Sequence, residues 1–263
     1  MSRLCAYCGK EGTFSREHIW PKCFLERVDY LAAHYSPESG NVHGADYIVK
    51  DVCQVCNNEK LSKLDQYFCS LYDIYFKEPR GPNSEVIFKY DFNLLSRVLL
   101  KIAYNTARSA GSETAPFQAL KNYILEGDVP PSPFAIIAEL VSPAYIVDNS
   151  KEISIPKEIP SIGYRSARAK LTTPHGHLVL VRIVSINSFF FHLLIGKEKT
   201  VDINLLVNEF LEYIPETTFI DPSSNVVILH SSHRTSLRSL LPLLLGKFDE
   251  FKKYFEKNRK EQS

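Results

Sequence analysis

The sequence predicts an α+β protein in two parts, a small cysteine-bearing module over residues 1–80 and a larger α+β domain over residues 81–263. Three observations lead to this prediction. Two Cys-x-x-Cys pairs lie near the N-terminus, a run rich in Pro, Gly and Asn at 78–84 is typical of a boundary loop, and helical and strand-like patterns follow without any repeat. With 44% hydrophobic and 23% charged residues, the 263-residue chain can bury a globular core.

Four cysteines form the two pairs, Cys5 with Cys8 and Cys53 with Cys56. A gap of two residues lets both thiolates of a pair reach one ion, and Gly9 suits the tight turn that the first pair needs. Two pairs complete a tetrahedral thiolate set and leave no position open for substrate, so we expect a structural zinc site. The alternative is four unrelated buried cysteines.

The N-terminus and the cysteine usage predict a cytoplasmic protein. No apolar run is long enough to cross a bilayer, and the opening "MSRLCAYCGK" lacks the charged-then-apolar pattern of a signal peptide. Because the cytosol keeps thiols reduced, we expect thiols or metal ligands rather than disulfides. Cys23 and Cys69, which lack the paired spacing, are expected to be core thiols.

The net charge of +1 gives no indication of a nucleic-acid partner. Its distribution says more, because residues 151–263 hold 16 basic and 12 acidic side chains, whereas residues 1–80 hold 10 and 11. A broad electrostatic contact with phosphate would therefore come from the C-terminal part, unless these lysines only form a solvated face.

An acid and a histidine, Glu17 and His18, follow the first cysteine pair in "SREHIWPK", and Asn57 follows the second pair in "CNNEK". This arrangement over residues 1–76 resembles the HNH, or His-Me finger, endonucleases, especially members whose ββα-metal core is clamped by four zinc-bound cysteines. The resemblance implies an acid-His pair at the end of a first strand, a second strand, and a helix that carries Asn57.

The resemblance also implies a chemistry for each residue. His18 is expected to be the general base, since a neutral imidazole can take a proton from water at physiological pH. Glu17 and Asn57 are expected to hold a catalytic Mg²⁺ or Mn²⁺, because carboxylate and amide oxygens suit these ions, whereas the cysteine thiolates suit zinc.

The chain departs from the family pattern in several places. The family more often has Asp at the position of Glu17, and the segment from Cys23 to Val49 is longer than the minimal motif. The middle residue of the motif is either Asn41 in "SGNVHG" or Asp51 in "KDVC". Asn58 could also take the place of Asn57.

A helix is predicted after Asn57, with a buried face formed by apolar residues at steps of three and four: Leu61, Leu64, Phe68 and Leu71. Lys60 and Lys63 lie off this face and either contact phosphate or are solvated. Trp20 is expected to pack beneath the metal loop rather than to stack on bases.

The C-terminal part is predicted to contain helices at 93–111, 116–127, 202–214 and 236–260, the last bent at Pro242, and strands at 134–141, 176–185, 188–196 and 225–230. Two histidine pairs have spacings that a metal could use, although hydrogen-bonded loop histidines are the commoner case: His175 with His177, and His230 with His233. Tyr104, Asn105 and Arg108 lie on one helix and are candidates to line a groove.

The sequence as a whole therefore predicts a metal-dependent HNH endonuclease that hydrolyses phosphodiester bonds, in DNA more than RNA, in restriction, phage defence or a mobile element. Residues 81–263 are expected to serve targeting, substrate recognition or regulation, with a regulatory protein as a further partner, and no membrane association is expected. The alternative is a non-catalytic zinc module that binds nucleic acid or a protein.

Overall fold

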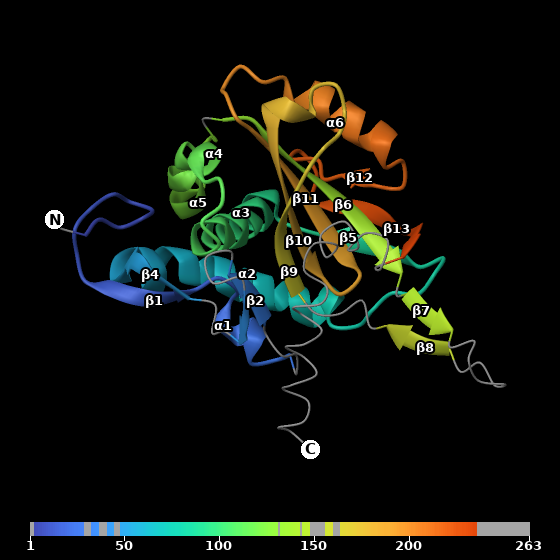
Figure 1. Ribbon diagram of the computed structural model, residues 1–263, viewed down its shortest axis with the longest axis horizontal. Helices are drawn as coiled ribbons and strands as arrows, with labels where there is room; N and C mark the ends of the chain where they lie inside the picture. The colour runs from blue at the N-terminus through green and yellow to red at the C-terminus, as the bar shows by residue number, and fades with distance from the viewer. Residues whose placement is uncertain are drawn as a thin grey trace.

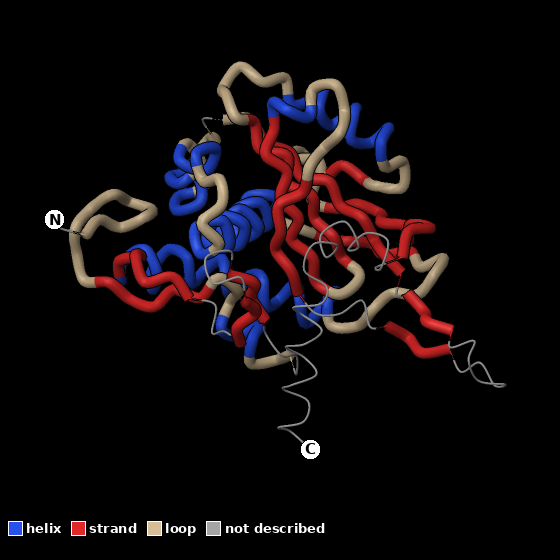
Figure 2. The backbone as a smooth tube through the Cα atoms, in the orientation of Figure 1, coloured by secondary structure: helices blue, strands red, loops and turns tan. Residues whose placement is uncertain are grey.

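The computed structural model describes residues 3–28, 33–36, 41–44, 48–130, 132–142, 144–147, 156–159 and 164–235. Within these residues, helices and sheets mix in the α+β fold that the sequence predicts (Figures 1 and 2). The expected helix at 236–260, with its bend at Pro242, lies outside the described residues. No described helix is both long enough and apolar enough to cross a membrane.

The N-terminal region contains a two-stranded sheet followed by a long helix. Strand β1 (Phe14–His18) pairs antiparallel with β4 (Ile48–Cys53). The connection between them holds α1 (Lys22–Leu25) and a second hairpin of β2 (Ala33–Ser36) and β3 (Asn41–Gly44). The helix then runs through η1 (Val55–Leu61), α2 (Ser62–Leu71) and η2 (Tyr72–Phe76).

The apolar residues that predict this helix are buried on its inner face, as expected. Its first and last segments are π-helical, with the N–H of Ser62 bonded to the carbonyl of Asn57 and the N–H of Lys77 bonded to that of Tyr72. Trp20 is also buried, where its ring packs against Phe24 and Phe68. It therefore belongs to the core and offers no surface for base stacking.

The C-terminal region is built on a seven-stranded sheet with the order β5-β13-β6-β11-β10-β9, to which β12 adds beside β6. All pairs are antiparallel except β13 with β6. The strands are β5 (Glu85–Lys89), β6 (Phe134–Ser142), β9 (Tyr164–Ala169), β10 (Val179–Ile186), β11 (Phe189–Gly196), β12 (Thr218–Phe219) and β13 (Val226–Thr235). A separate hairpin joins β7 (Ala144–Val147) to β8 (Pro156–Ile159), and a short 3₁₀ turn, η3 (Gly176–Leu178), precedes β10.

Helices cover both faces of this sheet (Figure 1). Helix α3 (Phe92–Ser109) packs on one face together with α4 (Ala115–Gln118) and α5 (Lys121–Glu126), and α6 (Ile203–Tyr213) packs on the other. The N–H of Leu94 donates to the side chain of Asp91, which caps α3. The single helix expected at 116–127 is two short helices, and it ends at Gly127 in a left-handed conformation.

A disulfide joins Cys23 of α1 to Cys69 of α2. The prediction that these two residues are core thiols is therefore wrong. The pairing depends on α1 lying across α2, a contact between segments 46 residues apart that the local spacing of neither cysteine indicates.

One buried core extends across the predicted boundary at 78–84. It includes side chains from the N-terminal helix, from α3 and from the sheet, while a second core lies between the sheet and α6. The boundary loop is also bonded to the sheet, because the N–H of Arg80 donates to Ser188 Oγ over 2.7 Å. The two parts are therefore held together by shared packing.

This shared core predicts a single unfolding transition. Trp20, the only tryptophan, packs on Tyr164 of β9 with ring centroids 4.9 Å apart and reports on the contact between the two parts. Urea unfolding followed by Trp20 fluorescence and by far-UV circular dichroism should give the same midpoint. A fluorescence transition at clearly lower urea would show that the N-terminal part unfolds independently.

Candidate metal centre and candidate active site

The four paired cysteines converge on one point. The Sγ atoms of Cys5, Cys8, Cys53 and Cys56 all lie within 4.8 Å of one another, and those of Cys8 and Cys53 are 3.8 Å apart. A tetrahedral zinc ion with Zn–S bonds of about 2.3 Å would hold its sulfurs about 3.8 Å apart. The arrangement therefore fits a structural zinc ion.

Local backbone structure brings the two pairs together. The first pair lies on a turn in which the N–H of Gly9 donates to the carbonyl of Cys5 over 2.9 Å. Gly9 has a φ of +70°, a left-handed conformation that favours glycine. The N–H of Ala6 donates to the carbonyl of Asp51 on β4, so the turn is fixed beside the strand that ends at Cys53.

The electrostatics of the cluster favour a bound cation. Burial raises the pKa of Cys5, but hydrogen bonds from the backbone N–H groups of Cys53, Cys8 and Tyr7 outweigh burial and lower this pKa to about 7. Burial and the neighbouring thiols raise the pKa of Cys53 and Cys56. One thiolate forms readily while its neighbours keep their protons, and a soft dication removes this conflict by stabilising all four thiolates.

Glu17 and His18 lie at the end of β1, where successive side chains point to opposite faces of the strand. The side chain of Glu17 is only 2% exposed, and its Oε1 lies 2.6 Å from Nζ of Lys101 on α3. The side chain of His18 is half-buried and makes an interaction of its own. The pair that the sequence presents as one unit is thus divided between the interior and the opposite face of β1.

Lys101 also binds Asp65 of α2, with its Nζ 2.5 Å from Oδ1. Burial lowers the pKa of Lys101, but the carboxylates of Asp65 and Glu17 outweigh burial and raise it, so the amine is charged. Burial raises the pKa of Glu17, and the charge of Lys101 opposes this effect. The three side chains form an ion cluster of one ammonium and two carboxylates, in which Lys101 and Glu17 are buried and Asp65 is partly exposed.

Asn57 ties the start of the helix to β1. Its Nδ2 donates to Oγ of Ser15 over 2.9 Å and to the carbonyl of Arg16 over 3.2 Å. Asn57 therefore lies beside the strand that ends in His18, whereas Asn58 is exposed. Both hydrogen bonds are donated by the amide nitrogen of Asn57.

The two candidates for the middle residue of the motif differ in what the structure describes. Asp51 on β4 forms an ion pair with Arg108 of α3. Asn41 is the first residue of β3 and pairs with Ser36, and its side chain lies outside the description. The identity of the middle residue stays a prediction.

One face of α3 contacts the N-terminal module, a contact that the sequence analysis does not predict. Asn105 accepts a hydrogen bond from the hydroxyl of Tyr7 over 2.7 Å and lies 3.5 Å from Glu17 through its Nδ2. Arg108 lies over the rings of Tyr7 and Tyr104. Tyr104 and Asn105 are buried in this contact rather than lining a groove. The signal for this contact is the spacing of Lys101, Asn105 and Arg108, which places three polar residues on one face of the helix.

The other sequence candidates are not brought together. Lys60 pairs with Glu126, and Lys63 is exposed. His175 bonds to Glu209 over 2.5 Å and His230 lies 3.6 Å from Glu85. His177 lies 3.2 Å from the carbonyl of Pro174, and the side chain of His233 is outside the description. Among the described residues, the four-cysteine group is the only cluster of His, Cys, Asp and Glu that could hold a metal.

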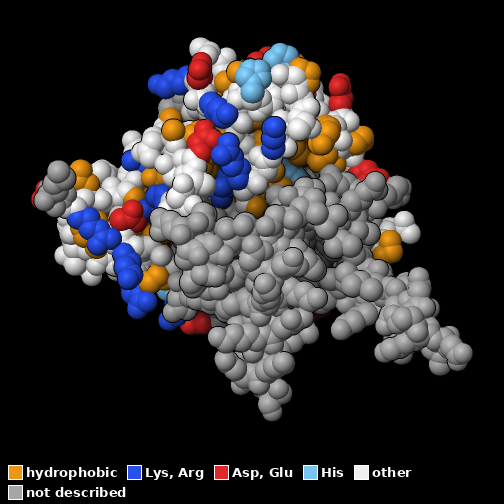
Figure 3. Space-filling view, in the orientation of Figure 1, with side chains coloured by type: hydrophobic (Ala, Val, Ile, Leu, Met, Phe, Trp, Pro, Cys, Tyr) orange, Lys and Arg blue, Asp and Glu red, His pale blue; other side chains and the backbone are white. Residues whose placement is uncertain are grey.

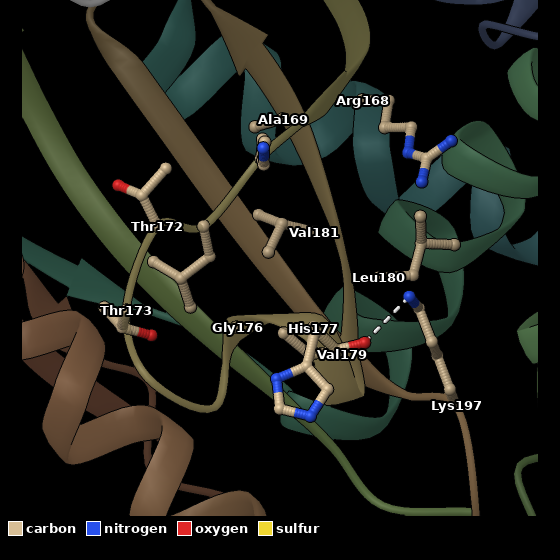
Figure 4. A pocket seen from close by; sticks show the side chains of 12 residues that line it. Arg168, Ala169, Thr172, Thr173, Gly176, His177, Val179, Leu180, Val181 and Lys197 are labelled. Atoms are coloured by element: carbon tan, nitrogen blue, oxygen red, sulfur yellow. Dashed lines mark hydrogen bonds between the residues drawn. The ribbon is translucent and has the colours of Figure 1, made fainter.

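A cavity of about 630 Å³ lies in the C-terminal region, between the start of β10 and the chain that follows β9 (Figure 4). Its lining includes the basic side chains of Arg168, Lys170 and Lys197, with His177, and no Asp or Glu. Lys197 donates to the carbonyl of His177 over 2.9 Å, as Figure 4 shows. Arg168 forms an ion pair with Glu113 at 3.0 Å, and the remaining positive charge of this lining, on Lys170 and Lys197, suits an anionic ligand.

No protein-family model, curated protein or solved structure matches this chain. The chemistry of the molecule is therefore inferred from its own residues.

The cysteine cluster predicts one zinc ion per chain. Structural zinc contributes about 10–16 kcal/mol to the folding of zinc-finger peptides, so Cys53→Ser should lose the metal and lower the Tm by about 10 °C or more. Elemental analysis and thermal unfolding measure both effects. Cys69→Ser, outside the cluster, should keep one zinc, and purified wild-type protein without zinc would contradict the prediction.

Proposed function

We propose that this protein is a zinc-stabilised HNH-type endonuclease that hydrolyses phosphodiester bonds. DNA is proposed as the substrate ahead of RNA, and the activity would serve restriction, phage defence or a mobile element. One observation supports the proposal above the others. Asn57, directly after the last cysteine of the cluster, is hydrogen-bonded to β1 at Ser15 and Arg16, which lie three and two residues before His18. Strand β1 and the start of the helix that follows the cluster are thus in contact. The family resemblance assigns the catalytic residues to these two elements.

His18 is the proposed general base. Its neutral imidazole takes a proton from a water molecule, whose oxygen then bonds to phosphorus. The bond from phosphorus to the 3′ oxygen breaks, and this oxygen takes a proton from solvent. The half-buried position of His18, on the face of β1 opposite Glu17, is consistent with access to a substrate.

The family resemblance also implies a catalytic Mg²⁺ or Mn²⁺ held by Glu17 and Asn57. Asn57 has an amide oxygen to offer, but Glu17 does not fit as a ligand, because its carboxylate is buried and bound to Lys101. Mg²⁺ or Mn²⁺ therefore stays an expected requirement for cleavage, without a ligand assigned on β1.

Basic side chains support a nucleic-acid substrate. Arg3, Arg16 and Lys50 are exposed around the β1–β4 sheet, and Figure 3 shows Lys and Arg side chains along this edge of the molecule. Such charges attract the phosphate backbone without reading sequence. The basic cavity beside β10 supports a role of residues 81–263 in targeting or regulation, through an anionic ligand.

The second candidate is a non-catalytic zinc module that binds nucleic acid or a protein partner. The pairing of Glu17 with Lys101 favours this candidate, because the carboxylate next to His18 in the sequence is then not available to a metal ion. The two candidates differ in one measurable property, the hydrolysis of phosphodiester bonds.

Cleavage assays on His18→Ala test the proposal. Plasmid, linear and single-stranded DNA and RNA are incubated with the zinc-loaded protein and Mg²⁺ or Mn²⁺. If His18 is the base, His18→Ala should lower the rate about 10²–10⁴-fold, the usual contribution of a positioned proton acceptor. Its zinc content and Tm should stay those of the wild type, because His18 lies outside the cysteine cluster.

The matched control is His230→Ala, which removes an exposed histidine far along the chain and should cleave as the wild type does. Equal rates for His18→Ala and the wild type would refute the mechanism. Binding of nucleic acid without hydrolysis of any substrate would favour the zinc module instead.

A further inference from the structure

The environment of Glu17 differs from that of a metal ligand. Its carboxylate receives the ammonium of Lys101 at 2.6 Å and lies 3.5 Å from the amide nitrogen of Asn105. The side chain of Lys101 is 0% exposed, and Glu17 is 2% exposed. The donors around this carboxylate come from α3, and they leave it almost no contact with bulk water.

A divalent cation on Glu17 would conflict with these contacts. Mg²⁺ keeps several of its waters when bound to protein, so its carboxylate ligands need room for a hydrated ion. It would also bring a double positive charge next to the charged amine of Lys101, inside a region of low dielectric. Lys101 already supplies the positive charge that this carboxylate requires.

The ion cluster connects three elements. Glu17 belongs to β1, Asp65 to α2 and Lys101 to α3. Breaking a buried ion pair leaves an uncompensated charge in the interior, so each partner holds the others in place. Since Glu17 precedes His18 directly, the cluster fixes the end of β1 from inside while His18 lies on the other face.

We propose that Glu17 and Lys101 are a positioning pair that fixes the strand end carrying His18, and that Glu17 is not a ligand of the catalytic metal. The pair acts through His18, and neither member touches the substrate. The rate measurements that test this inference rest on the proposed nuclease function. The stability and spectroscopic measurements are independent of that function.

Unfolding of single and double variants gives the first test. Lys101→Met leaves the buried carboxylate of Glu17 and the partly exposed carboxylate of Asp65 without their cation, and it should lower the Tm by about 6–15 °C. Glu17→Gln leaves Lys101 its second partner, Asp65, and should cost less. The Tm of the double variant should fall by less than the sum of the two single-variant losses. The control Arg27→Met removes the exposed pair with Asp73 and should shift the Tm by no more than about 2 °C.

Metal titration gives the second test. In Glu17→Gln, kcat should fall while KM for DNA and the Mg²⁺ midpoint stay within about twofold of the wild type, and Lys101→Arg should recover part of the rate that Lys101→Met loses. A Glu17→Gln protein with an unchanged Tm and a Mg²⁺ midpoint raised about tenfold or more would overturn the proposal.

Spectroscopy separates this inference from the proposed function. If the wild-type protein cleaves nothing, the nuclease proposal fails, and the NMR resonance of the His18 imidazole still reports on positioning. Lys101→Met should shift or broaden this resonance, and Arg27→Met should leave it unchanged. A His18 resonance that is the same in Lys101→Met and in the wild type would overturn the positioning role.

Discussion

The convergence of four thiol groups is the constraint on which the N-terminal module depends. Cys5 and Cys8 lie on a turn, Cys53 ends β4, and Cys56 lies in the first turn of η1. Each of these segments is too short to hold its conformation alone, and sulfurs this close favour ionisation only around a cation. One ion bound at this point would order a turn, a strand end and a helix start together, next to Asn57.

Helix α3 carries this order into the rest of the molecule. A lysine in a protein interior costs free energy unless its charge is paired, and Lys101 finds two carboxylates on two other elements. A spacing of four and then three residues also places Asn105 and Arg108 on the face of α3 that meets Tyr7 and Asp51. These bonds are directional, so they fix how the module sits on α3, whereas the surrounding apolar packing alone would tolerate small rotations.

Local patterns allowed much of the fold, and part of the candidate site, to be predicted. The cysteine cluster follows from a two-residue spacing, and α3, α6 and the strands β6, β10, β11 and β13 follow from apolar periodicity. The disulfide of Cys23 with Cys69 and the pairing of Glu17 with Lys101 could not be predicted, because each joins segments far apart in the chain through contacts that exist only once the helices pack. The burial of Glu17 could not be predicted for the same reason, since the sequence shows its neighbour His18 but not that α3 covers its side chain. Nuclease activity remains a proposal, carried by His18 and Asn57.

The path of β13 has a consequence for the synthesis of the protein. Its first half, from Val226 to His230, pairs with β5, and its second half continues beside β6. Strand β5 lies at the edge of the described sheet and has β13 as its partner there. As the chain leaves the ribosome, β5 emerges early but waits for more than a hundred residues before its partner follows. Strand β5 therefore stays unpaired until residues 226–230 have been translated. Its exposed edge is open to wrong pairing during that interval.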